Sequence, residues 1–161
     1  MPNLLQRIDK PQDLHELSED ELQAVAQEVR EHIIDTVGEI GGHFGANLGA
    51  CEIAVALHSL LRSPDDKILW DVGHQAYPHK ILTGRRDQLP TIRQYEGLAP
   101  FCAIHESEHD IMGAGQAHQA GAGARHGRRG RIGPLFGLAA GRRARVDSHL
   151  LAHPRRPARD G

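Results

Sequence analysis

The longest regular pattern in the chain is an apolar stripe over residues 22–40, and it constrains the fold more than any other feature. Apolar side chains recur there at spacings of three and four, the period of one face of an α-helix. Ser18 and Glu21 have the spacing of a capping box, and Gly41-Gly42 provides a stop. The sequence therefore predicts an amphipathic helix that must bury its stripe against other elements.

Three more elements are predicted downstream of this helix. Residues 51–61 are apolar on most sides, which predicts a buried helix. The bulky run Lys67–Asp71 predicts a short strand. A helix that begins near Gln75 or Pro78 and ends at Gly84 completes the series. The order helix, helix, strand, helix is typical of an α/β fold.

The distribution of charge divides the chain at residue 115. Residues 1–115 hold 9 basic and 19 acidic side chains, whereas residues 116–161 hold 10 arginines and 2 acidic side chains. The second region has no lysine, no glutamate and no helical or strand period. We therefore predict a folded region over residues 1–115 and a disordered basic tail over residues 116–161.

Composition also limits the compartment and the redox chemistry. No apolar run approaches the roughly 18 residues that cross a bilayer, and the first residues do not resemble an export signal. We therefore expect a cytoplasmic protein. Cys51 and Cys102 lack the CxxC spacing, so we predict buried thiols rather than a disulfide.

A glycine-rich segment surrounds one histidine. Residues 41–49 place four glycines around His43, which suits a backbone that approaches a ligand beside an imidazole able to exchange protons near neutral pH. A plain loop that joins two helices explains the same residues.

A second segment, residues 70–80, gathers His74, Tyr77, His79 and Lys80 at the predicted strand-to-helix turn. In open α/β sheets, ligands bind beyond the carboxyl ends of strands, and such a turn can hold an anionic phosphate. The alternative is a structural turn with surface charges.

Residues 105–109 read H-E-x-x-H, which on a helix would bind zinc. No amphipathic helix is expected around His105 and His109, so we do not interpret the string as a zinc site. The arginines of the tail could neutralise phosphates of a nucleic acid. Because the tail has few aromatics and no recognisable reading module, we do not expect a nucleic-acid partner.

The order of two strings resembles one family. Residues 41–49, Gly-Gly-His-Phe-Gly-Ala-Asn-Leu-Gly, and residues 70–86, which begin Trp-Asp-Val-Gly-His-Gln-Ala-Tyr-Pro-His-Lys, are similar to the 1-deoxy-D-xylulose-5-phosphate synthase family. The resemblance covers about residues 4–115 and implies part of a transketolase-like α/β domain in a homodimer. It also implies thiamine diphosphate and Mg²⁺ as cofactors, and pyruvate and D-glyceraldehyde 3-phosphate as substrates.

The resemblance also implies roles for single residues. His43 matches a histidine that lines the substrate pocket and shuttles protons, so it is the implied catalytic residue. His74 matches a histidine that contacts thiamine diphosphate. Gly115, Gln116 and Ala117 occupy the place of a cofactor-binding triplet whose middle residue is histidine in the family.

The chain departs from the family after residue 115. The Gly-Asp-Gly loop that binds magnesium in the family is absent from this sequence, so no metal ligand is predicted. Our hypothesis is that residues 116–161 arise from a shifted reading frame. The family's reaction is then an activity by resemblance that this chain does not complete, and a non-catalytic remnant or a basic-tailed binding module is the alternative.

Overall fold

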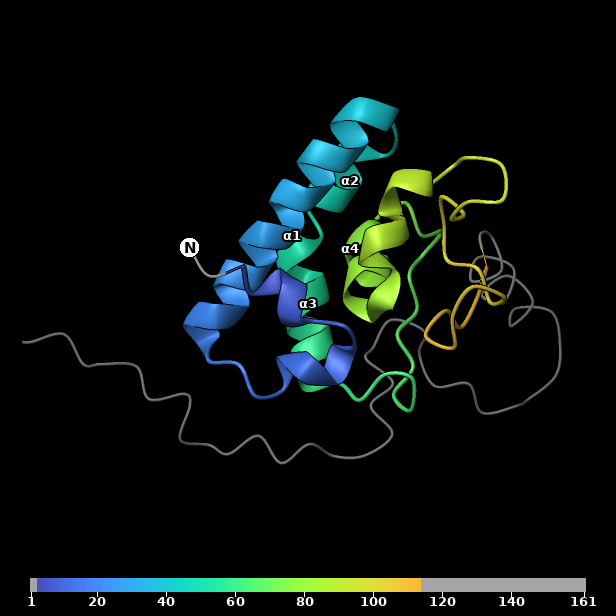
Figure 1. Cartoon of the computed structure of the whole chain (residues 1–161). Coiled ribbons are helices and arrows are strands. Elements are labelled where there is room, and N and C mark those ends of the chain that lie inside the picture. Colours follow the sequence, from blue (N-terminus) through green and yellow to red (C-terminus); the bar gives the residue numbers. More distant parts are fainter. Residues whose placement is uncertain (1–2, 114–161) are drawn as a thin grey trace, which may run out of the picture.

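The computed structural model describes residues 3–113, and α1, Glu19–Ile40, is their longest element (Figure 1). Ser18 Oγ accepts a hydrogen bond from the Glu21 N–H, while the Glu21 carboxylate accepts one from the Ser18 N–H at 2.8 Å. At the other end Gly41 has a φ of 75°, which a residue with a Cβ adopts at a cost. Both predicted ends of the helix are confirmed.

Shorter helical elements follow and precede α1 along the chain. The α-helices are α2, Phe44–Leu48, α3, Cys51–Leu60, and α4, Tyr77–Lys80. The 3-10 turns are η1, Leu5–Arg7, η2, Pro11–Leu14, and η4, Arg86–Thr91, and a π-turn, η3, Ile81–Arg85, continues α4. The helix predicted before Gly84 is thus present, and Gly84 ends its regular part with a φ of 83°.

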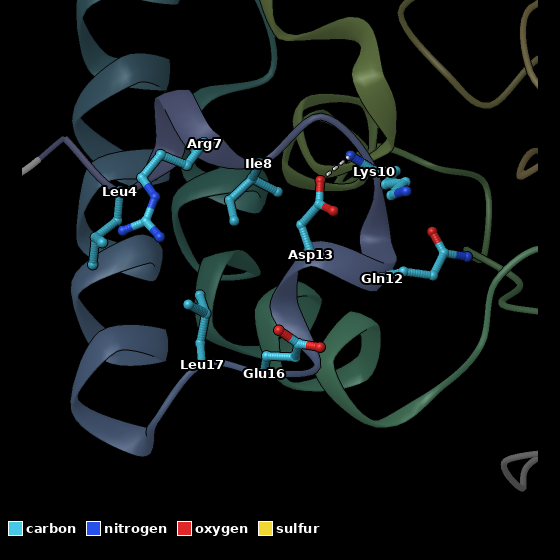
Figure 2. A pocket seen from close by; sticks show the side chains of 8 residues that line it. All are labelled: Leu4, Arg7, Ile8, Lys10, Gln12, Asp13, Glu16 and Leu17. Carbon is cyan, nitrogen blue, oxygen red and sulfur yellow. Dashed lines mark hydrogen bonds between the residues drawn. The ribbon is translucent and has the colours of Figure 1, made fainter.

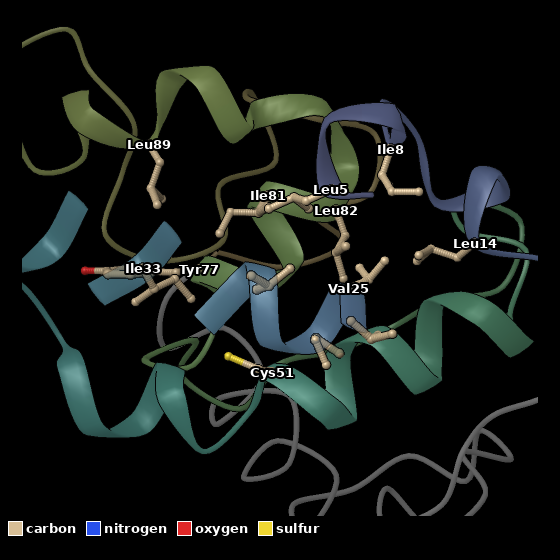
Figure 3. Packing of buried hydrophobic residues seen from close by; sticks show 14 of the residues in the cluster. Leu5, Ile8, Leu14, Val25, Ile33, Cys51, Tyr77, Ile81, Leu82 and Leu89 are labelled. Atoms are coloured by element: carbon tan, nitrogen blue, oxygen red, sulfur yellow. The ribbon is translucent and has the colours of Figure 1, made fainter. Parts of the chain in front are cut away.

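One hydrophobic core connects these elements. The α1 stripe packs against α3, α2 and α4, and the N-terminal turns add leucines to the same cluster (Figure 3). Among the fully buried side chains are Leu14, Val25, Val29, Ile33, Cys51, Tyr77, Ile81, Leu82 and Leu89. Cys51 and Cys102 are both buried and free, as predicted.

The α3 helix is buried on one side only. Cys51, Ala54 and Val55 face the core, but 56% of Ile53 and 78% of Leu60 are exposed. The predicted helix is confirmed, and its predicted burial holds for one side only.

The strand predicted at Lys67–Asp71 is absent. Residues 67–70 have no assigned secondary structure, and residues 3–113 contain no strand at all. A strand requires a neighbouring strand to complete its backbone hydrogen bonds, and this range of the chain supplies none. The α/β fold is therefore not confirmed by the described residues, which are helical. None of the described helices is both long and apolar enough to cross a membrane.

Candidate active site

The two histidines predicted as site residues lie in contact. The rings of His43 and His74 meet edge to face with centroids 4.7 Å apart, although 30 residues separate them in the sequence. The Phe101 ring lies 5.5 Å from His43 and 5.2 Å from His74. The structure thus brings two imidazoles from separate segments beside one aromatic ring.

Glycines allow the two segments to approach closely. A Cβ on Gly42 would lie 3.0 Å from the Tyr77 hydroxyl, so a larger residue would displace that ring. Gly73 has a φ of 90°, and a Cβ there would lie 3.3 Å from the Cys102 nitrogen. His43 lies on the predicted loop, but Phe44–Leu48 forms α2, so the plain-loop interpretation describes only its first residues.

The two imidazoles differ in their surroundings. Burial lowers the pKa of His43, and the nearby His74 and Arg93 lower it further. His43 Nδ1 is buried and has no hydrogen-bond partner within residues 3–113. His74, by contrast, is exposed. The lowered pKa favours the neutral imidazole of His43 at pH 7, and its buried Nδ1 makes no hydrogen bond within the described residues.

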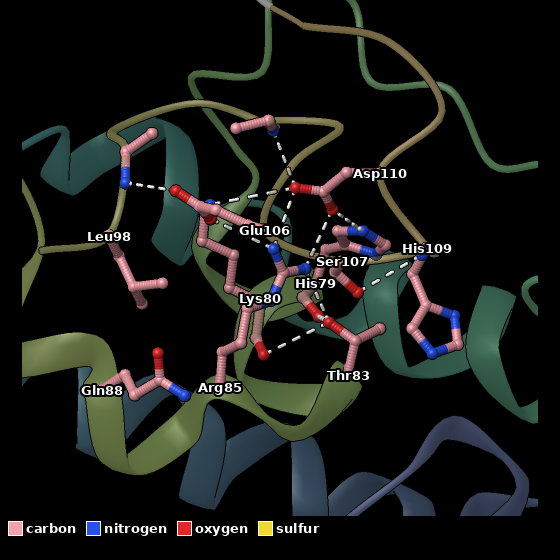
Figure 4. A network of polar contacts seen from close by, with 12 residues as sticks. His79, Lys80, Thr83, Arg85, Gln88, Leu98, Glu106, Ser107, His109 and Asp110 are labelled. Atoms are coloured by element: carbon pink, nitrogen blue, oxygen red, sulfur yellow. Dashed lines mark hydrogen bonds and ion pairs between the residues drawn. The ribbon is translucent and has the colours of Figure 1, made fainter.

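His79 and Lys80, in contrast, lie inside the protein. Both are completely buried, and Lys80 forms an ion pair with Glu106 (Figure 4). Their charges and hydrogen-bonding groups are therefore satisfied by other residues of the chain. Neither the phosphate-binding interpretation nor the surface-charge interpretation of residues 70–80 holds for these two side chains.

The network in Figure 4 is centred on Asp110. Arg85 donates two hydrogen bonds to its carboxylate, at 2.8 and 2.9 Å, and Lys80 Nζ lies 3.9 Å away. Burial alone would raise the pKa of Asp110, but hydrogen bonds from His79 and Arg85 hold that pKa well below its ordinary range. The two buried cations, Arg85 and Lys80, and the two carboxylates, Asp110 and Glu106, thus neutralise one another.

A chain of two histidines ends on the same carboxylate. His79 Nε2 lies 3.0 Å from Asp110 Oδ1, and His58 Nε2 lies 2.9 Å from His79 Nδ1. A carboxylate only accepts, so His79 Nε2 donates; the Nδ1 of the neutral ring then accepts from His58. Burial lowers the pKa of both histidines, that of His58 to about 2.

The network also holds the segment that carries Phe101. The Ala99 N–H donates to Glu106 Oε1 at 2.6 Å, and the Ala103 N–H donates to Asp110 Oδ2 at 2.7 Å. Both bonds fix the backbone on either side of Phe101. The buried charges therefore support the aromatic wall of the histidine pair.

Comparison with known proteins identifies the family of the chain. The family model described as 1-deoxy-D-xylulose-5-phosphate synthase matches residues 5–128. The chain belongs to this family. Proteins named 1-deoxy-D-xylulose-5-phosphate synthase are similar to it over much of its length. The one from Thermomicrobium roseum is 59% identical over 114 residues, and the one from Saccharophagus degradans is 55% identical over 114 residues.

The likeness covers a small part of the relatives. The matched residues are 70% and 71% of this chain for those two proteins and 18% of each relative. The relative from Neisseria meningitidis is 48% identical over 137 residues, which are 85% of this chain and 20% of the relative. The chain therefore spans about a fifth of a 1-deoxy-D-xylulose-5-phosphate synthase. The domain boundary at residue 115 stays a prediction.

The triplet predicted to bind the cofactor, Gly115, Gln116 and Ala117, lies outside the described residues. Side chains among residues 3–113 differ in how well they suit the family's two cofactors, thiamine diphosphate and Mg²⁺. The free Nδ1 of His43 and the exposed ring of His74 suit an organic cofactor or substrate. No described group suits Mg²⁺ equally well, since this ion requires several oxygen ligands.

The H-E-x-x-H string does not form a zinc site. His105 lies exposed in a turn, Glu106 pairs with Lys80, and His109 Nδ1 lies 2.8 Å from Ser63 Oγ. The ligand atoms of His79, Cys102 and Asp110 do lie within 4.8 Å of one another. Both oxygens of Asp110, however, already accept hydrogen bonds from Arg85, and Oδ1 also bonds His79, while burial raises the pKa of the Cys102 thiol to about 12.

A surface pocket of about 390 Å³ lies at the N-terminal turns (Figure 2). Its lining residues are Leu4, Arg7, Ile8, Lys10, Gln12, Asp13, Glu16 and Leu17. The Asp13 carboxylate accepts hydrogen bonds from the backbone of Asp9 and Lys10, so it caps η2. None of these residues belongs to the histidine pair or to the Asp110 network.

Sequence reasoning missed three contributors to the site. Phe101 contacts the rings of His43 and His74, and Asp110 bonds His79 of the second segment, and only the fold shows these contacts. Asn47 lies inside the glycine-rich string, where a single amide side chain among glycines was the available signal. Its Nδ2 donates to the carbonyls of both His43 and His74.

Proposed function

We propose that this chain supplies the His43 and His74 part of a 1-deoxy-D-xylulose-5-phosphate synthase active site. The reaction condenses pyruvate with D-glyceraldehyde 3-phosphate and releases CO₂. The observation that supports this proposal is the 4.7 Å contact between two histidines that come from the two strings similar to the family. The enzyme class is a thiamine-diphosphate-dependent transferase.

The two histidines take different roles in the proposal. His43 is neutral at pH 7 and has a ring nitrogen without a hydrogen-bond partner among residues 3–113, so it accepts and returns a proton at the substrate. His74 is exposed beside it and contacts thiamine diphosphate. The cofactor, when bound, supplies the electron sink for decarboxylation, which no protein side chain provides.

The remaining parts of the site come from elsewhere in the family polypeptide. This sequence lacks a Gly-Asp-Gly loop, so we propose that Mg²⁺ and the diphosphate are held by regions that the chain does not span. Residues 67–71 pair there with a strand of the same regions, which restores the α/β sheet. The complete enzyme is a cytoplasmic homodimer, and this chain alone does not turn over substrate.

Calorimetric titration tests the role of His74. A chimera is made from the Thermomicrobium roseum relative by replacing its matching 114 residues with those of this chain. The chimera is expected to bind thiamine diphosphate in the presence of Mg²⁺, and His74→Ala is expected to weaken this binding by about tenfold, the effect of 1.4 kcal/mol. The isolated 161-residue chain is expected to give no saturable heat.

His105→Ala is the matched control, because His105 is also exposed and lies outside the histidine pair. Equal affinity of the chimera and its His74→Ala variant would refute the role of His74. Tight, magnesium-dependent binding to the isolated chain would refute the claim that the metal loop lies elsewhere. A chimera that binds no cofactor would favour a non-catalytic remnant, which the coverage of only 18% of the relatives also allows.

A further inference from the structure

Asn47 is a completely buried amide in the centre of the candidate site. It lies in α2, between the loop of His43 and the turn of His74. Buried amides are retained where their hydrogen bonds are satisfied, so the partners of Asn47 indicate what it does.

The amide nitrogen of Asn47 joins the two histidine segments. Nδ2 donates one hydrogen bond to the His43 carbonyl and a second, at 2.8 Å, to the His74 carbonyl. These carbonyls belong to the residues whose rings meet at 4.7 Å. One side chain therefore ties together the backbones on both sides of the ring contact.

The amide oxygen of Asn47 bonds a third backbone segment, the start of α4. Oδ1 accepts a hydrogen bond from the Tyr77 N–H at 2.8 Å, and the buried Tyr77 hydroxyl accepts one from the His43 N–H at 3.4 Å. The path from Asn47 through Tyr77 returns to His43. This closed arrangement fixes the start of α4 relative to the loop of His43.

We propose that Asn47 is a positioning residue that sets the separation of the His43 and His74 rings by holding their two backbones. The functional meaning of that separation rests on the proposed function, but the positioning itself does not. Asparagine alone combines two donors and one acceptor at this length. Aspartate lacks the donors, and alanine lacks all three groups.

The test compares Asn47→Asp and Asn47→Ala with the wild-type chain by nuclear magnetic resonance. The nuclear Overhauser effect between ring protons of His43 and His74 is expected in the wild type and is expected to disappear in both variants. Exchange of the Tyr77 N–H should become about fivefold faster in Asn47→Ala, the effect of losing one hydrogen bond. Asn47→Asp keeps the acceptor and should protect the Tyr77 N–H better than Asn47→Ala.

Ser63→Ala is the matched control. It removes another buried side-chain hydrogen bond, the one to His109, at a site that does not contact the histidine pair. This variant should keep the contact between the His43 and His74 rings. Loss of that contact in Ser63→Ala as well would show general loosening and would overturn a specific role for Asn47, as would an unchanged contact in both Asn47 variants.

A measurement on the wild type decides the question even where the variants fail to fold. The side-chain amide protons of Asn47 should exchange far more slowly than those of exposed glutamines, because both are hydrogen-bonded in the interior. Exchange as fast as that of the exposed glutamines would overturn the inference. None of these measurements requires a cofactor, so absence of thiamine-diphosphate binding would count against the proposed function alone.

Discussion

Asp110→Asn is expected to lower the free energy of unfolding of the chain by about 3–5 kcal/mol, which is the effect of removing one partner from a buried ion pair. Asparagine keeps the shape of the side chain, but it has a single acceptor oxygen, so it can accept either from His79 at the Oδ1 position or from the Ala103 N–H at the Oδ2 position. The loss therefore comes from the charge and from one buried donor left without an acceptor.

The size of this effect follows from the balance of the network. Arg85 and Lys80 are buried, and their charges are matched by Asp110 and Glu106. Without the Asp110 carboxylate, two buried cations share the single carboxylate of Glu106. An uncompensated charge in the interior is expensive because few water molecules reach it.

Urea unfolding measures the difference, with Asp87→Asn as the control. Asp87 also pairs with an arginine, at 3.0 Å to Arg86 Nε, but 86% of its side chain is exposed. Exposed ion pairs contribute little, so this variant should change stability by less than about 1 kcal/mol. Equal effects of the two substitutions would contradict the account of a buried, mutually neutralised network.

Acidification from pH 7.5 to 5.5 is expected to destabilise the chain by about 1 kcal/mol through His58, and His79 is expected to add to this loss in the same direction. Burial lowers the pKa of both histidines in the folded chain, that of His58 to about 2, whereas the unfolded chain has the ordinary value of 6.5. Folding therefore favours the neutral form of both imidazoles.

The direction of the effect follows from proton uptake. Below pH 6.5 the unfolded chain binds protons at these histidines and the folded chain does not, so the equilibrium shifts toward unfolding as pH falls. Above pH 6.5 both states are neutral and the effect vanishes. The pKa of Asp110 is lowered in the folded chain, so protonation of this group in the unfolded chain adds to the loss of stability only below about pH 4.

Urea midpoints at pH 7.5 and 5.5 test this prediction. His58→Phe removes one of the titrating groups while keeping a ring against His79, so it should reduce the pH dependence of stability. His105→Asn, at an exposed position, should leave it unchanged. Equal midpoints at both pH values for the unaltered chain would show that the buried histidines do not remain neutral in the fold.

The helices could be predicted from the sequence because their signals are local. The capping residues Ser18 and Glu21 and the stop at Gly41 lie within the helix or next to it. The strand at Lys67–Asp71 could not be settled in the same way, because a strand depends on a partner that local patterns do not show.

The sequence indicates His43 and His74 through two strings of residues, and their roles stay predictions. Their contact could not be predicted, because Asn47, Gly42 and Phe101 lie around it only in the folded chain. The burial of Lys80 is a second feature that the sequence alone does not show. Its burial results from Glu106, 26 residues away, and no pattern in residues 70–80 contains that information.

We propose that His43 moves a proton in the family's reaction, and product formation by the chimera tests this role of His43. From pyruvate and D-glyceraldehyde 3-phosphate, the chimera should form 1-deoxy-D-xylulose 5-phosphate. His43→Ala should lower kcat by about 10²–10⁴-fold, the usual contribution of a general acid–base, while cofactor affinity changes little. A His43→Ala chimera that keeps the kcat of the unaltered chimera would contradict the account.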